Sequence, residues 1–205
     1  MIDLYVINLP HRKDRWDHMI KTFSDPEFNL IKVEAETHNK KSWIGCFMSH
    51  KKCLQIAKDK GLNNVWVLED DCEPIDIESF KDRFLKIKNY LDSNNDWNIF
   101  LGGTASLHPN SYNKIIKFDD QVLVEFAKAY MTHMVCYNQN VYDMFLNDPM
   151  YKPVDEFWFN KIKALIPVPF IATQLEGYSD IIKKVKSDKT RILEANNKLI
   201  KYINK

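Results

Sequence analysis

The stretch of sequence that decides the fold is residues 65–71, Val-Trp-Val-Leu-Glu-Asp-Asp. Four consecutive apolar residues, with two asparagines before them and three acids after them, are typical of a short strand that is covered on both faces. Strands of this kind occur in parallel sheets with helices packed on either side. The stretch therefore predicts an α/β fold with acids at the carboxyl end of a buried strand.

The residues on both sides of this stretch alternate between strand and helix patterns. In the first half, the predicted strands are 2–9, 31–35, 65–68 and 97–101. Apolar residues at helical spacing predict helices around 16–23, 46–57 and 77–91. In the second half we predict strands at 115–118, 122–127, 131–137 and 168–172, and helices at 141–145, from 154 and from 181. We therefore expect a single α/β domain over residues 1–205, with a central, mostly parallel sheet flanked by helices.

The charge of the chain argues against nucleic-acid binding. The 205 residues carry 29 Lys and Arg against 28 Asp and Glu, a formal net charge of +1, whereas nucleic-acid binding rests on a strong basic excess. This total is a cancellation, because residues 181–205 hold eight Lys and Arg and two Asp and Glu, which leaves 21 and 26 in residues 1–180. We expect this basic C-terminal tail to be an amphipathic helix with a solvated outer face. Docking to an anionic membrane surface, to a partner or to an adjoining domain is the alternative.

Several common site motifs are absent from the sequence. The five glycines form no G-x-G or G-x-x-x-x-G pair, so neither a dinucleotide-binding turn nor a phosphate-binding loop is present. The four cysteines form no C-x-x-C pair and are expected to be buried, reduced thiols. No apolar run reaches the roughly 20 residues of a membrane span, and the N-terminus lacks a signal-peptide pattern. We therefore expect a cytoplasmic protein or a domain of a longer one.

Acids are concentrated after the strand at 65–68. Six of the ten residues from Glu69 to Glu78 are Asp or Glu. Their mutual repulsion is unfavourable at the mouth of an apolar strand unless a cation binds there. Since no cysteine or histidine ligand is evident nearby, carboxylates alone favour a hard cation, Mg²⁺ or Mn²⁺. Capping of the next helix explains Asp76 and Glu78, but it does not explain Glu69, Asp70 and Asp71.

Cations follow the first predicted strand. Arg12, Lys13 and Arg15 lie within four residues, at the expected start of a helix. A helix N-terminus favours anions, so three cations are unfavourable there unless they bind something else. Such side chains hold phosphate groups; the alternative is a solvated first turn.

Three segments, in this order and spacing, resemble glycosyltransferase family 25: VINLPHRKDRW at 6–16, GCFMSH at 45–50 and VWVLEDD at 65–71. The later Pro153-Val154-Asp155 is similar to the family's P-V-D, and Gln174 with Ser179-Asp180-Ile181 is similar to its closing segment. The sequence differs from the family pattern at Ser42-Trp43, which stands in place of Gly-Glu, and at His11, which stands in place of an arginine.

The resemblance implies a GT-A-type (Rossmann-like) fold and inversion at the anomeric carbon of a UDP-hexose donor. It also implies a divalent cation, Mn²⁺ or Mg²⁺. The acceptor would be a hydroxyl of a glycan, a lipid-linked saccharide or a protein.

The same resemblance implies a role for each candidate residue. Those expected to bind the nucleotide sugar are Asn8, Arg12, Arg15, Ser49, His50, Glu69 and Asp70. Asp71 is expected to bind the metal together with Glu69, and the third ligand stays open between Asp180 and His133. Inversion requires a base beside the acceptor hydroxyl; Asp155 is the candidate and Glu156 the alternative. Phe157, Trp158 and Phe159 would offer a sugar-stacking face or belong to the core.

Two other functions fit the same residues. A transferase fold that has lost catalysis could still bind a nucleotide or glycan. Acids at strand ends would also serve another metal-dependent enzyme that acts on phosphoryl groups, such as a nucleotidyltransferase. Product analysis separates these functions, and the sequence alone leaves them open.

Overall fold

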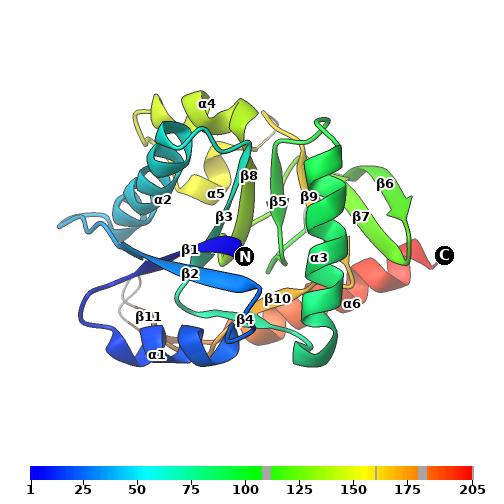
Figure 1. The fold of residues 1–205 in the computed structure, drawn as a ribbon, viewed down its shortest axis with the longest axis horizontal. Helices are drawn as coiled ribbons and strands as arrows, with labels where there is room; N and C mark the ends of the chain where they lie inside the picture. Colours follow the sequence, from blue (N-terminus) through cyan, green and yellow to red (C-terminus); the bar gives the residue numbers. More distant parts are fainter. Residues whose placement is uncertain (108–111, 160, 180–183, 205) are drawn as a thin grey trace.

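The computed structural model of the chain describes residues 1–107, 112–159, 161–179 and 184–204 (Figure 1). In this part of the chain, eight strands form a central sheet in the order β2 (Phe28–Glu34), β1 (Ile2–Asn8), β3 (Asn64–Glu69), β8 (Met134–Asn138), β5 (Ile99–Leu101), β9 (Ala164–Val168), β7 (Gln121–Phe126) and β6 (Tyr112–Phe118). Of these eight strands, only β8 and β7 are antiparallel to β1. The predicted α/β fold with a mostly parallel sheet is therefore confirmed.

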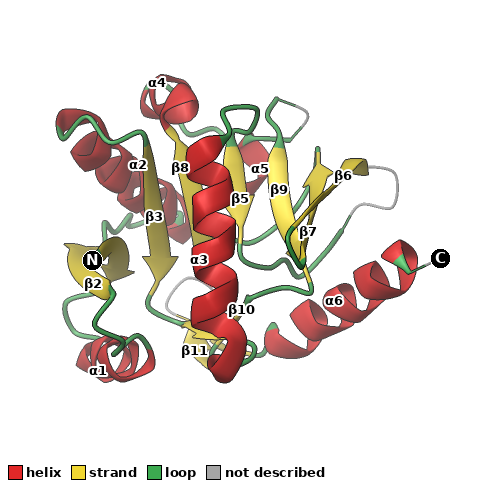
Figure 2. Ribbon diagram, turned by 45° about the vertical axis from the view of Figure 1, so that its right-hand side comes forward, coloured by secondary structure: helices red, strands yellow, loops and turns green. Residues whose placement is uncertain are grey.

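Helices cover both faces of the sheet, and Figure 2 shows α3 in front of it with α2 and α5 behind. The helices are α1 (Lys13–Thr22), α2 (Ser42–Asp59), α3 (Ile77–Ser93), α4 (Tyr142–Leu146), α5 (Val154–Phe157) and α6 (Lys189–Ile203), with a 3₁₀ turn at Gln139–Val141. Two short ribbons pair β4 (Cys72–Pro74) with β10 (Ala172–Gln174), and β11 (Gly177–Ser179) with β12 (Lys184–Lys186).

The core lies in two layers, one on each face of the sheet. In β1, Leu4 and Val6 belong to the buried cluster that includes residues of α1 and α3, whereas Tyr5 and Ile7 belong to the cluster that includes residues of α2, α4, α5 and α6. This alternation follows from the two-residue period of a strand. Because both faces are buried, β1 and β3 have nearly continuous apolar sequences, and their polar residues are confined to the strand ends.

Helix α3 illustrates why the predicted helices form where they do. Its Phe80, Phe84, Ile87 and Leu91 are buried along one face, which matches the helical period. The helix starts after Asp76, whose carboxylate accepts a hydrogen bond from the backbone N–H of Glu78 at 3.1 Å. Helix capping therefore accounts for this part of the acidic run.

Two predictions in the C-terminal third are wrong. The stretch 168–172, expected to be a strand, instead connects two strands, because β9 ends at Val168 and β10 begins at Ala172. Pro169 between them has no N–H to donate to a sheet. The tail helix begins at Lys189 rather than at 181, since residues 184–186 form β12. Position 181 itself lies outside the described residues.

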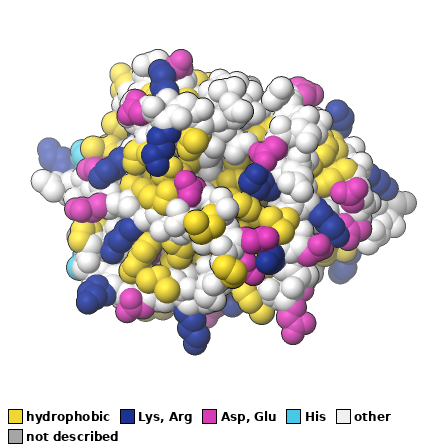
Figure 3. Space-filling model, in the orientation of Figure 1, with side chains coloured by type: hydrophobic (Ala, Val, Ile, Leu, Met, Phe, Trp, Pro, Cys, Tyr) yellow, Lys and Arg dark blue, Asp and Glu magenta, His cyan; other side chains and the backbone are white. Residues whose placement is uncertain are grey.

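Helix α6 packs on the core through one face and is solvated on the other. Ile192, Ala195 and Leu199 are buried, while Arg191, Lys198 and Lys201 are exposed. On the face of the molecule shown in Figure 3, positive and negative side chains are interspersed. No helix among the described residues has both the length and the apolar character that crossing a membrane requires.

Gly45, in the second turn of α2, allows the helix to approach the loop after β2. A Cβ at this position would lie 2.6 Å from the carbonyl oxygen of Glu36. We expect Gly45→Ala to lower the free energy of unfolding, because overpacking costs about 1–3 kcal/mol against about 1 kcal/mol gained from helix propensity. Urea unfolding measures the change. Gly177→Ala is the matched control, since a Cβ there meets nothing within 4 Å; equal stability of both variants would contradict this close packing.

Candidate active site

The carboxyl ends of β1 and β3 lie side by side, because Ile7 pairs with Glu69 in a parallel register (Figure 1). Asn8 ends β1, and its Nδ2 donates hydrogen bonds to Asp70 Oδ2 at 2.8 Å and to the Arg12 carbonyl at 3.0 Å. Asn8 is fully buried. The register therefore joins two predicted site residues that are 62 positions apart in the sequence.

Arg15, from α1, lies against the acidic cluster. Its Nη1 is 2.6 Å from Asp70 Oδ1 and 3.3 Å from Asp71 Oδ2, and its Nη2 donates to the Tyr178 carbonyl at 2.9 Å. Arg12 pairs with Asp14 at 2.8 Å, and its Nη1 donates to the same Tyr178 carbonyl at 3.4 Å. Of the two arginines predicted to reach a nucleotide, the structure therefore brings Arg15 to the carboxylates.

Two side chains that the sequence did not assign to the site contact Glu69. The Thr132 hydroxyl donates to Glu69 Oε1. Gln174 Nε2 donates to Glu69 Oε2 at 3.5 Å and to Asp71 Oδ1 at 3.4 Å, and so joins the two carboxylates. Both residues come from segments far along the chain, and only Gln174 carried a signal, as part of the closing segment of the family pattern.

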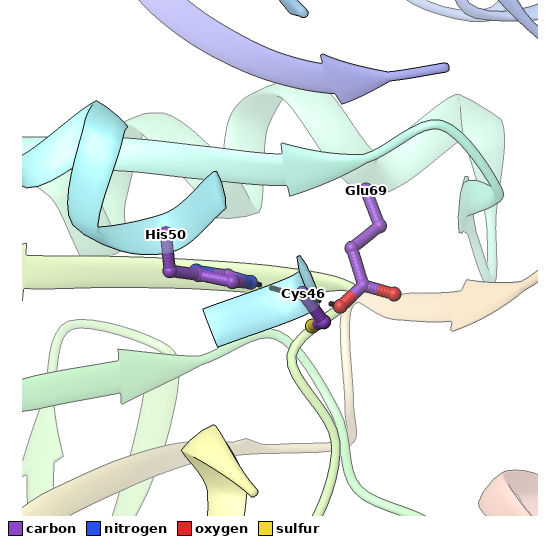
Figure 4. Close-up of side chains that lie close together, drawn as sticks. All are labelled: Cys46, His50 and Glu69. Carbon is purple, nitrogen blue, oxygen red and sulfur yellow. Dashed lines mark ion pairs between the residues drawn. The ribbon is translucent and has the colours of Figure 1, made fainter. Parts of the chain in front are cut away.

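Helix α2 brings Cys46 and His50 to Glu69 (Figure 4). His50 Nε2 lies 3.7 Å from Glu69 Oε1, and His50 Nδ1 lies 2.9 Å from the Tyr137 hydroxyl. The expectation that no cysteine or histidine lies near the carboxylates is therefore wrong. It failed because a helix packed on the sheet places residues at 46 and 50 beside a strand end at 69.

Ser49 immediately precedes His50 in α2 and binds the loop after β2. Its hydroxyl donates to the Gly45 carbonyl at 2.8 Å and accepts the Glu36 N–H at 2.8 Å. These bonds hold the loop after β2 against α2.

Asp155 and Glu156, the two candidate bases, have different surroundings. Asp155 is half-buried in α5, and its Oδ2 accepts the Met131 N–H at 3.2 Å. Glu156 is exposed. Phe157 and Trp158 are buried in the core, so these two aromatic residues do not form a sugar-stacking face. The half-buried Phe159 packs edge-on against Tyr130.

The two candidates for a third metal ligand are Asp180 and His133. Asp180 lies outside the described part of the chain. His133 is fully buried, and neither of its ring nitrogens has a hydrogen-bond partner among the described residues. It lines neither of the cavities described next.

Two cavities lie on either side of the carboxylates. The first, of about 380 Å³, is bounded by the loop after β2 (35–40), by α2 and by the ends of β1 and β3. The second, of about 200 Å³, is bounded by Trp43, Thr132, Asp155 and Gln174. Four residues line both cavities and so form the wall between them: Arg15, Cys46, Glu69 and Asp71. The first cavity lies within the range of about 300–1,000 Å³ that is typical of small-molecule sites, and the second is smaller.

A sequence profile of glycosyltransferase family 25, described as an LPS biosynthesis protein family, matches residues 40–157. This match covers more than half of the chain and includes α2, β3 and Asp155. The chain belongs to glycosyltransferase family 25. The predicted resemblance is confirmed.

Curated relatives of this family 25 chain are procollagen galactosyltransferases. It is 27% identical over 187 residues to procollagen galactosyltransferase 2 of Mus musculus, which covers 76% of this chain and 29% of the relative. The human protein of the same name is 27% identical over 159 residues, and the match covers 63% of this chain and 25% of the relative. The matched region therefore spans less than a third of the length of these relatives.

Two solved structures are similar to the family 25 chain at low sequence identity. A197 from STIV has a TM-score of 0.47 and 13% identity, with 91% of this chain and 99% of that chain covered. A glycosyltransferase involved in glycosylation of the major capsid of PBCV-1 has a TM-score of 0.44 and 10% identity, with 70% and 63% covered.

The carboxylates of this family 25 site differ in their pKa values. Burial, followed by the charge of Glu69, raises the pKa of Asp71 to about 7. Burial also acts to raise the pKa of Glu69, but the neighbouring His50 and Thr132 outweigh it and hold that pKa below its usual value. Asp71 is therefore the carboxylate whose charge the metal-free site disfavours most.

The raised pKa of Asp71 predicts a pH-dependent stability in metal-free buffer. Between the usual value of 3.8 and about 7, the folded chain binds this proton and the unfolded chain does not. The free energy of unfolding therefore falls as pH rises through this window. Asp71→Asn removes the fall and is expected to be the more stable protein at high pH.

Urea unfolding with EDTA at about pH 5 and about pH 8 tests this sign. The stability difference between Asp71→Asn and wild type should grow in favour of the variant as pH rises. A difference that stays constant, or that shrinks, would show that the folded chain does not disfavour the charge of Asp71.

Proposed function

We propose that this chain is a metal-dependent, inverting glycosyltransferase with a GT-A fold. It moves a hexose, galactose or glucose, from a UDP-sugar to a hydroxyl of a glycan, a lipooligosaccharide or a protein. Membership of glycosyltransferase family 25 supports the reaction class, and the names of the curated relatives favour galactose.

The observation that carries this proposal is the wall of carboxylates between two cavities. A transfer reaction needs a donor on one side of the reacting carbon and an acceptor on the other. The larger cavity is lined by five of the residues predicted to bind the nucleotide sugar: Arg15, Ser49, His50, Glu69 and Asp70. The smaller cavity contains Asp155, the candidate base. We assign the donor to the first cavity and the acceptor to the second.

The residues present fit a hard divalent cation. Glu69, Asp70 and Asp71 supply oxygen donors, which Mg²⁺ and Mn²⁺ prefer. Asp71 is half-buried, and burial, followed by the negative charge of Glu69 that Arg15 does not fully compensate, raises its pKa to about 7. Asp71 and Glu69 would hold the ion. When bound, it would supply positive charge beside the leaving diphosphate.

The chain's own side chains have separate roles in the proposed reaction. Asp155 accepts the proton of the acceptor hydroxyl as the new bond to the anomeric carbon forms and the bond to UDP breaks, so that UDP leaves with the bonding electrons. Burial raises the pKa of Asp155, which makes its carboxylate a stronger base. Arg15 orients Asp70 and Asp71, and Asn8 holds Asp70 in place.

The free thiols of all four cysteines support the further proposal of a reducing compartment such as the cytoplasm. The basic outer face of α6 leaves peripheral membrane contact as a separate proposal, which liposome binding by wild type and by a chain truncated at residue 190 would test.

Product analysis tests the reaction class. The chain is incubated with Mn²⁺ and each of UDP-glucose, UDP-galactose and their N-acetyl forms, and the products are identified by mass spectrometry. Release of UDP supports the proposal. Release of UMP and a sugar phosphate would instead assign the site to phosphoryl chemistry, and calorimetric binding of UDP without any turnover would assign it to a binding module.

A further inference from the structure

Three donor atoms of different chemistry lie close together at the wall between the two cavities. The sulfur of Cys46, a ring nitrogen of His50 and a carboxylate oxygen of Glu69 all lie within 4.8 Å of one another (Figure 4). Cys46 and His50 are four residues apart in α2 and therefore project from the same face of the helix. We refer to Cys46, His50 and Glu69 as the Cys-His-Glu cluster.

The imidazole of His50 has a ring nitrogen that makes no hydrogen bond with the described residues and is aimed at Glu69 Oε1, its ion-pair partner at 3.7 Å. The side chain is fully buried, and its Nε2 has no hydrogen-bond partner among the described residues. Nδ1, on the other side of the ring, lies 2.9 Å from the Tyr137 hydroxyl. A buried polar atom without a hydrogen-bond partner is unfavourable. A ring held through one nitrogen, with the other left available, is the arrangement that metal-binding histidines adopt.

We propose that the Cys-His-Glu cluster binds a borderline divalent cation of the Zn²⁺ class, through the Cys46 thiolate, His50 Nε2 and the Glu69 carboxylate. Mixed sulfur, nitrogen and oxygen donors select Zn²⁺ over Mg²⁺ or Mn²⁺. A tetrahedral Zn²⁺ places its ligand atoms about 3.4–3.6 Å apart, and the His50–Glu69 separation is already 3.7 Å. The Cys46 proton is released to solvent on binding.

The cluster has an entry path and an open fourth position. Cys46 and Glu69 line both cavities, so an ion reaches the cluster without unfolding of the core. Water from either cavity completes the tetrahedron.

Occupation of this site has a consequence for the proposed reaction. Glu69 belongs both to the cluster and to the carboxylates assigned to the hard cation, so Zn²⁺ would withdraw Glu69 from Asp71 and inhibit sugar transfer. This inhibition rests on the proposed function, whereas the binding of Zn²⁺ does not.

Co²⁺, which replaces Zn²⁺ and absorbs light, tests the binding directly. We expect wild type to bind one equivalent and to develop the near-ultraviolet band of a thiolate–Co²⁺ bond. Cys46→Ala should lose that band and bind Co²⁺ at least ~10-fold more weakly, because loss of even an outer-shell partner costs that much. Cys53→Ala is the matched control: it removes a buried thiol of the same helix outside the cluster and should keep the band.

A second measurement needs no variant. Alkylation of Cys46, followed by mass spectrometry, should be at least ~10-fold slower with one equivalent of Zn²⁺ than with Mg²⁺. No thiolate band in wild type, a band that persists in Cys46→Ala, or alkylation unaffected by Zn²⁺ would each overturn the site.

Asp71→Asn separates this inference from the proposed function. That variant should keep the thiolate–Co²⁺ band even though it lacks sugar transfer. If Asp71→Asn loses UDP release but keeps the band, the loss is specific to the carboxylate site. If wild type releases UDP but shows no band, the Zn²⁺ site alone is overturned.

Discussion

Asp71→Asn is expected to reduce Mn²⁺-dependent release of UDP by about 10³-fold or more, with the fold intact. Asp71 lies in the wall between the cavities and carries the most strongly raised carboxyl pKa of the cluster. Asparagine keeps the shape but removes the negative charge that would hold the proposed divalent cation. Charge stabilisation of a leaving group contributes about 10²–10³-fold per interaction, and loss of the cation removes more than one.

The control for this variant is Glu78→Gln, which removes a charge from the same acidic run. Glu78 is exposed in the first turn of α3, away from both cavities, so UDP release should stay unchanged. Kinetics with saturating donor and Mn²⁺, together with thermal unfolding, give both quantities. Full turnover by Asp71→Asn would rule out the assigned metal ligand.

Asp155→Asn is expected to lower kcat by about 10²–10⁴-fold, the usual contribution of a general base. Asparagine can still accept the hydrogen bond that Met131 N–H donates to Asp155 at 3.2 Å, so the local structure is preserved while the proposed base is lost. KM for the donor should change little, because Asp155 lines the smaller cavity and not the larger one.

Glu156→Gln is the matched control for the base, since it changes the adjacent carboxylate. Glu156 is exposed, and the variant should keep wild-type kcat. The acid limb of the pH–rate profile should also disappear in Asp155→Asn. A large loss in Glu156→Gln with none in Asp155→Asn would reverse the assignment.

Most of the fold follows from local pattern. The apolar runs of β1 and β3 predict buried strands, and the spacing of Phe80, Phe84, Ile87 and Leu91 predicts α3. The exceptions arise where short elements depend on tertiary pairing. β10 and β12 have three residues each and are stabilised by their partners β4 and β11, so neither leaves a periodic signal of its own.

Less of the candidate site could be predicted. The acids after β3 and Asn8 after β1 stand at strand ends, and the parallel register of Ile7 with Glu69 brings them together as expected. Thr132 and Gln174 reach Glu69 from loops and a short ribbon, and Cys46 reaches it through helix packing. Such contacts depend on how elements pack, which hydrophobic periodicity alone does not encode.

A crystal structure with Mn²⁺ and UDP bound tests the central claim most directly, because the claim assigns donor and acceptor to different cavities. The account predicts density for UDP in the larger cavity, with the uridine toward the loop at 35–40, the diphosphate toward Asp71, and the ion on the carboxylates of Asp71 and Glu69. UDP in the cavity of Asp155, or an ion away from both carboxylates, would contradict it.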